Sequence, residues 1–343
     1  MPRGRPQLLP YLARRKIHVR YGVRVWDGAR AAKLAVKFLV TALLLFVAFR
    51  TVDVVSVSKL LSRLSAAWTA AAFALTALII ASDAILMARV IRTFEQRMRF
   101  GTAFRYSLVG WFFSNVAPSM GGDVFRGLQL ARVGMSPSSA ARLVVAVRIL
   151  SFSTLVLVML MGFPIAVRLL SAPRDVFLLG SIILAATGAI CALFAFAYVT
   201  ARIPKLEQWI FGRRLEAIAG DVQKLLVPSF PIAGAWLAAF VQHLLRVGTL
   251  VCLAAGLGLG IPFAVLFAFT PAALLLAMLP ISLGGWGVRE LTFVYLLGAA
   301  GIGAEAALSL SIAFGLLRMI IGTIGGITWV MLSDHHFRLD TSA

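Results

Sequence analysis

Charged residues are scarce in this sequence, and acidic ones especially so. Only 13% of the residues are charged, and 13 Asp and Glu stand against 33 Lys and Arg. With 61% hydrophobic residues, the chain has too little polar surface to coat a soluble globule of this length. The positive charge stands mostly between apolar runs, without the interleaved aromatic residues that would suit nucleic acid. We therefore expect an integral membrane protein that does not bind nucleic acid.

Signatures of catalysis and metal binding are also missing. The sequence has no P-loop, no His-Glu-x-x-His, no paired-cysteine motif and no Gly-x-Ser-x-Gly. Its two cysteines, Cys191 and Cys252, lie in apolar runs without a second ligand at metal spacing. We predict no catalytic residue, no metal and no cofactor. A membrane-embedded transferase that uses one of the few acids or His243 as a base stays open as an alternative.

What the sequence has in abundance is apolar runs long enough to cross the ~30 Å hydrocarbon layer. We predict six full spans and, between them, two interrupted segments at 104–132 and 263–299 that re-enter the membrane as helical hairpins. This arrangement puts most of the 33 Lys and Arg residues on one side, as cytoplasmic loops require. The predicted spans are 34–49, 66–88, 139–165, 176–199, 231–257 and 304–332.

The two halves of this pattern repeat each other with every direction reversed. The predicted fold class is thus an all-α polytopic membrane protein with an inverted-topology repeat. The first repeat covers 34–170, and the second covers 171–332 with an interfacial helix at 203–227. A basic segment at 1–33 and a tail at 333–343 are predicted to be cytoplasmic. The basic segment and the interfacial helix are expected to contact anionic lipid.

One eight-residue motif occurs twice, once in each predicted hairpin, as SMGGDVFR at 119–126 and SLGGWGVR at 282–289. A Gly pair in the middle of the membrane interrupts the helix and leaves backbone N–H and C=O groups without helical hydrogen bonds. Such groups are tolerated at that depth only where they line a cavity. A helix that begins at such a point offers N–H groups and its positive dipole end to an anion. An Arg one turn later adds a bidentate donor suited to phosphate. The motifs predict an anion site near the midplane, where the two hairpin tips meet.

Ionisable residues in other spans extend this predicted site, because each costs at least ~2.5 kcal/mol in the membrane core. The predicted substrate-binding residues are Gly121, Gly122, Arg126, Gly284, Gly285, Arg289, Arg148, Arg246 and Arg318. The predicted candidates for proton or ion coupling are Asp123, Glu290, His243 and Asp83. Helix capping, helix packing and internal ion pairing stay open as structural roles for these residues.

The segments 115–126 (NVAPSMGGDVFR) and 280–290 (PISLGGWGVRE) resemble the lysylphosphatidylglycerol synthase transmembrane family, also called the flippase-like domain family. The resemblance covers about 34–332. It implies a multi-pass membrane protein that moves lipids between leaflets, aminoacylated phosphatidylglycerol in the fused members. We expect it in the bacterial inner membrane, and whether it works with a separate lipid-modifying enzyme stays open. This sequence does not include the aminoacyl-transferring domain of the fused family members, so the lipid is left open, as is the oligomeric state.

The expected function is therefore a flippase that moves a phosphate-headgroup or modified lipid by alternating access. The alternative is a membrane-embedded synthase or transferase component that acts on a lipid-linked substrate. A transporter of a non-lipid solute stays open as a third possibility.

Overall fold

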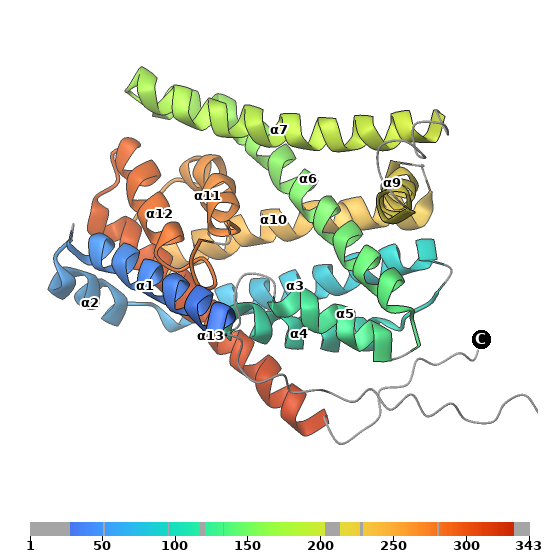
Figure 1. Ribbon diagram of the computed structural model, residues 1–343. Coiled ribbons are helices and arrows are strands. Elements are labelled where there is room, and N and C mark those ends of the chain that lie inside the picture. The colour runs from blue at the N-terminus through green and yellow to red at the C-terminus, as the bar shows by residue number, and fades with distance from the viewer. Residues whose placement is uncertain are drawn as a thin grey trace, which may run out of the picture.

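The computed structural model describes residues 28–332 except 51, 95, 117–120, 133, 203–212, 227–228 and 280. Within these residues the chain forms 12 α-helices, one short 3-10 helix and no strand (Figure 1). The fold is therefore all-helical, as predicted. Most of the predicted N-terminal segment, the tail at 333–343 and the first part of the predicted interfacial helix lie outside the described residues.

Five helices are apolar and long enough to cross a membrane, and they match five of the six predicted spans. Their length follows from uninterrupted apolar sequence, because a helix that satisfies its own backbone hydrogen bonds is the stable form in hydrocarbon. The five are α3 (Ala66–Val90), α6 (Pro137–Leu169), α7 (Pro173–Arg202), α10 (Phe230–Gly256) and α13 (Ala304–Leu332).

The first predicted span coincides with α1 (Gly28–Arg50), which is followed by the short helix α2 (Val54–Ser62). By length and composition, Ala35–Arg50 qualifies as a span only together with α2, and the two helices meet at 90°. Asp53 begins α2, because its carboxylate accepts hydrogen bonds from the N–H groups of Val55 and Ser56, each at 3.1 Å. The sequence analysis placed no helix between the spans 34–49 and 66–88, and the cap explains why one forms here.

Each of the two interrupted segments forms a pair of helices whose arms pack against each other. The first pair is α4 (Phe100–Val116) and α5 (Gly121–Arg132), and the second is α11 (Phe263–Ala277) and α12 (Val288–Ala299). The second arms have 12 residues each, which corresponds to about 18 Å of helix. They are too short to cross a hydrocarbon layer of ~30 Å. In both pairs the Gly pair of the repeated motif stands at the break.

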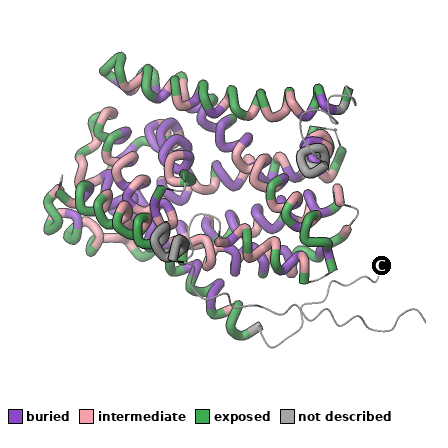
Figure 2. Tube along the Cα trace, viewed as in Figure 1, coloured by how far each residue is buried: buried purple, intermediate pink, exposed green. Residues whose placement is uncertain are grey.

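The long helices and the hairpins pack in a reciprocal pattern. α3 lies along α10, α4 of the first hairpin packs on α13, and α11 of the second hairpin packs on α6. α7 crosses α6 and contacts α9 (Arg213–Leu226), which is the described part of the predicted interfacial helix. Only 11% of the most apolar stretch of α7 is buried inside the protein. Figure 2 shows most of this helix as exposed or intermediate. The core therefore sits where α3, α6, α10, α11 and α13 meet.

Small residues set the distance between α13 and α4. A Cβ atom added at Gly325 would lie 2.2 Å from the carbonyl oxygen of Leu108. One turn earlier, a Cβ at Gly322 would lie 2.4 Å from the side-chain nitrogen of Asn115. Close backbone approach of this kind is how membrane helices associate, since they lack a hydrophobic drive against lipid.

We expect Gly325→Ala to destabilise the protein, because the neighbouring atom is backbone and cannot move aside. Overpacking of this kind costs about 1–3 kcal/mol. The matched control is Gly188→Ala on α7, where an added Cβ meets nothing within 4 Å and where Ala favours the helix by up to ~1 kcal/mol. Thermal unfolding of both variants in detergent measures the difference. Equal midpoints would show that α4 and α13 do not pack this closely.

Candidate functional site

A cavity of about 460 Å³ lies between the two hairpins and the long helices. Its wall is formed by residues of α3, α4, α5, α6, α7, α10, α11 and α13, together with the turn that follows α11. One part of the wall is apolar and includes Val145 and Ile149 of α6 and Ile190 and Leu193 of α7. The rest carries seven of the nine ionisable residues that the sequence predicted for the site. The cavity is thus amphipathic.

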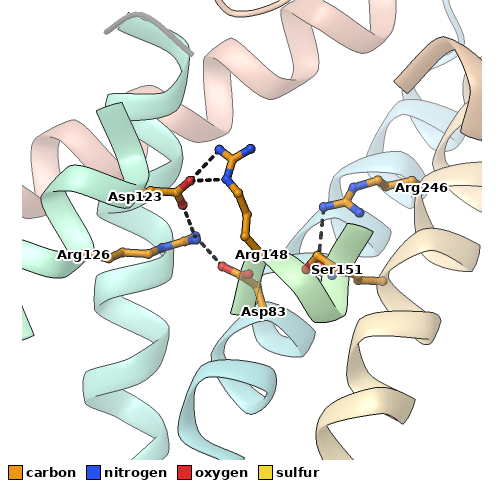
Figure 3. A network of polar contacts seen from close by, with 7 residues as sticks. Asp83, Asp123, Arg126, Arg148, Ser151 and Arg246 are labelled. Carbon is orange, nitrogen blue, oxygen red and sulfur yellow. Dashed lines mark hydrogen bonds and ion pairs between the residues drawn. The ribbon is translucent and has the colours of Figure 1, made fainter. Parts of the chain in front are cut away.

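Figure 3 shows a chain of ion pairs among residues that line the cavity. Arg126 of α5 donates to the Asp83 carboxylate of α3 at 2.5 Å and lies 3.6 Å from Asp123, one turn earlier on its own helix. Arg148 of α6 binds the other end of the chain, with its Nε 2.6 Å from Oδ2 of Asp123. Burying charges is costly unless they are paired. These contacts join three helices by compensated charges.

A second polar group lies on α10 and faces α6. His243 Nε2 is 2.9 Å from the carbonyl oxygen of Ser151, and Nδ1 is 2.9 Å from Nη1 of Arg246. Because a guanidinium can only donate, Nδ1 must accept, and Nε2 must then carry the proton that is donated to the carbonyl. His243 is therefore neutral in this arrangement. Gln242 completes the group by donating to Ser151 Oγ at 3.0 Å and accepting from Arg246 at 3.3 Å.

Two arginines of the cavity lack an acidic partner. Arg246 and Arg318 both line the cavity and are half-buried. Among the residues that the structure describes, neither has a carboxylate oxygen within 4 Å. Arg318 lies over the ring of Trp111, with its guanidinium carbon 5.7 Å from the ring centroid. The side of the cavity nearest α10 and α13 is therefore cationic.

The glycines of the second motif copy add backbone donors to the same wall. Gly284 and Gly285 line the cavity and have positive φ angles of 58° and 79°. Within the described residues, neither N–H donates a hydrogen bond to another backbone group. Consecutive N–H groups in such conformations form concave binding sites for anions. The turn between α11 and α12 thus brings both glycines to the cavity wall, whereas α12 itself begins only at Val288.

The remaining predicted site residues do not line the cavity. Arg289 is 1% exposed and Glu290 0% exposed, and they bind each other between α12 and α13. Gly122 is buried between the hairpin arms, where a Cβ would lie 2.1 Å from Ser114 Oγ. Gly121 begins α5 and is not part of the cavity wall. In the first hairpin, Gly122 thus allows close packing of the two arms.

Several polar residues of the cavity were missed by the sequence analysis. Gln242 precedes Arg246 by one helical turn, and Ser151 follows Arg148 by three residues, so both share a helix face with a predicted residue. That spacing is a signal that could have found them. Trp111 and Ser114 lie on α4, before the motif, and carry no comparable signal. Among the described residues, no three His, Cys, Asp or Glu side chains are placed to hold a metal ion.

These features define a multi-pass helical membrane protein with an amphipathic, partly cationic internal cavity. The chain belongs to a known family: the model described as lysylphosphatidylglycerol synthase TM region matches residues 34–326. This confirms the resemblance that the two motif segments indicated. A comparison with curated proteins found no match.

Proposed function

We propose that the protein is a lipid translocase that carries a phosphate headgroup through the cavity while the acyl chains stay in the membrane. This proposal is carried by Arg246 and Arg318, which have no carboxylate partner among the described residues, and by Gly284 and Gly285, which line the same cavity and whose N–H groups donate to no described backbone acceptor. A phosphate accepts hydrogen bonds from both kinds of donor. The apolar wall of α6 and α7 suits an acyl chain that follows the headgroup. The family's name, which refers to the synthesis of an aminoacylated phospholipid, supports lipid as the cargo.

The packing pattern supports an inverted repeat with two re-entrant hairpins. Exchanging α3 with α10, α4 with α11 and α6 with α13 leaves the main contacts unchanged, since α4 packs on α13 as α11 packs on α6. Such a repeat has two related arrangements that open to opposite sides. The proposed transport cycle is alternating access, in which one half moves against the other around the cavity.

We further propose that the protein resides in the bacterial inner membrane with both termini in the cytoplasm, as the distribution of Lys and Arg favours. In this role it is a transporter and performs no bond chemistry on its cargo. A separate enzyme would modify the lipid, and anionic lipid would bind the basic cytoplasmic face.

Product formed by purified protein in detergent, where no leaflets exist, would favour the alternative of a membrane-embedded transferase.

Asp83 and Asp123 are the stronger candidates for coupling transport to protons or ions. Both line the cavity, and both hold an arginine there, so protonation of either carboxylate would free a cation for the cargo. His243 donates and accepts within the protein, and Glu290 is bound to Arg289 and to the N–H of Gly287. These two groups would have to exchange partners before they could carry a proton.

The proposal is tested by reconstituting the protein into vesicles that contain a tail-labelled fluorescent phospholipid. Wild type is expected to expose inner-leaflet label to external dithionite faster than protein-free vesicles do. The Arg246→Gln/Arg318→Gln variant is expected to be at least about tenfold slower, because each charge-assisted hydrogen bond contributes about 1.5–3 kcal/mol. Arg168→Gln, at an exposed position on α6, is the matched control and should resemble wild type. A wild-type rate equal to that of empty vesicles, with every phospholipid tested, would refute the proposal.

A further inference from the structure

The cavity holds more positive than negative charge, and the difference can be assigned to particular residues. Four arginines and two aspartates line it among the described residues, and no lysine or glutamate does. His243 adds no charge, because its two nitrogens are engaged as one donor and one acceptor. The paired arginines Arg126 and Arg148 are neutralised by the two aspartates. Two positive charges are left without compensation.

Both uncompensated charges lie in the wall of one cavity. Arg246 comes from α10 and Arg318 from α13, two helices that pack against each other, and both residues line the cavity. Two unpaired guanidinium groups in a medium of low dielectric constant raise the free energy of the empty cavity. A ligand that brings two negative charges removes this cost in full, whereas a ligand with one negative charge leaves one arginine unpaired.

We propose that the cavity selects a dianionic phosphate, such as a phosphomonoester or a diphosphate end group, over a monoanionic phosphodiester. This rests on the proposed function and narrows its substrate class. A phosphomonoester carries about −1.5 to −2 charges at pH 7 and has three terminal oxygens. It can accept from both arginines and from a hairpin N–H group together. A phosphodiester carries one charge, so it compensates only one of the two arginines.

The selectivity is measured with the full-length protein in detergent by native mass spectrometry. The probes are phosphatidic acid, a phosphomonoester, and phosphatidylglycerol, a phosphodiester, with identical acyl chains. Wild type is expected to bind phosphatidic acid at least about tenfold more tightly, the ratio that one charge-assisted hydrogen bond gives. Arg246→Gln leaves a single unpaired charge and is expected to lose most of this preference. Arg318→Gln should do the same and serves as the second variant in case one fails to fold.

Arg168→Gln is the matched control and should keep the wild-type preference. Inorganic phosphate as a competitor separates the two sources of a dianion. If it displaces phosphatidic acid at equal concentration, the site still prefers a dianion but takes a soluble one. If it does not, the acyl chains contribute and the ligand is a lipid.

Equal affinity of wild type for the two lipids, unchanged in both variants, would overturn the inference. That result would leave the translocase proposal intact, because the vesicle assay decides it separately for each lipid. Conversely, a preference for phosphatidic acid without movement of any lipid in vesicles would keep the dianion site and refute translocation.

Discussion

Arg289→Met is expected to destabilise the protein more than the loss of an unpaired cavity arginine such as Arg318. The substitution keeps an unbranched apolar stem, removes the guanidinium and leaves the Glu290 carboxylate buried, with 0% exposure and no ion-pair partner. Breaking a buried pair by removing one partner costs about 3–5 kcal/mol. Arg318 faces the cavity instead, so that its removal leaves no acid unpaired. Thermal unfolding in detergent should show a large fall for Arg289→Met and a small change for Arg318→Gln.

The second substitution Glu290→Gln provides the control. Glu290 Oε2 accepts from the N–H of Gly287 at 2.6 Å, and a glutamine oxygen can keep this bond without carrying a charge. The double variant Arg289→Met/Glu290→Gln is therefore expected to regain most of the lost stability. A different outcome would change the role of Arg289: normal stability in Arg289→Met together with weaker lipid binding would make it a ligand, as the motif had suggested.

The sequence alone was enough to predict the helical fold, because apolar length and the distribution of charge act locally along the chain. It also predicted that four arginines come together: Arg126, Arg148, Arg246 and Arg318. The reason is that ionisable side chains in mid-membrane face the protein interior or a water-filled cavity and avoid lipid. The structure brings all four to one cavity from four different helices. The pattern of apolar runs did not predict the helix at Val54–Ser62, because this helix depends on a local cap.

The partners of these arginines could not be predicted from the sequence. The contact between Arg126 and Asp83 joins residues 43 positions apart, and its geometry depends on how α3 and α5 pack. The roles of the two motif arginines could not be predicted either, because the two copies have similar sequences but different structural surroundings. Arg126 lines the cavity, whereas Arg289 meets an acid at the next position and an α13 hydroxyl, Ser311, at 3.1 Å. Which arginine is free for a ligand is a property of tertiary packing.

Gly285→Ala is expected to have the second-largest effect, through the turn of the second hairpin. Gly285 has φ 79°, a conformation that costs a residue with a Cβ about 1–2 kcal/mol. A Cβ there would also lie 2.7 Å from the carbonyl oxygen of Ala277, at the end of α11. Relieving that overlap requires a backbone shift, which adds about 1–3 kcal/mol. The turn is expected to move away from α11 and to withdraw its N–H groups from the cavity.

Gly284→Ala is the matched substitution one position earlier. Gly284 also has a positive φ, of 58°, but its Cβ would meet no atom closer than 3.5 Å. Both variants therefore carry the conformational cost, and only Gly285→Ala carries the overlap. We expect both to unfold at lower temperature than wild type, with the larger fall for Gly285→Ala. Phosphatidic acid binding should weaken clearly in Gly285→Ala and little in Gly284→Ala. Equal effects of the two would mean that conformational strain alone matters, and that close contact with α11 does not hold the hairpin tip at the cavity.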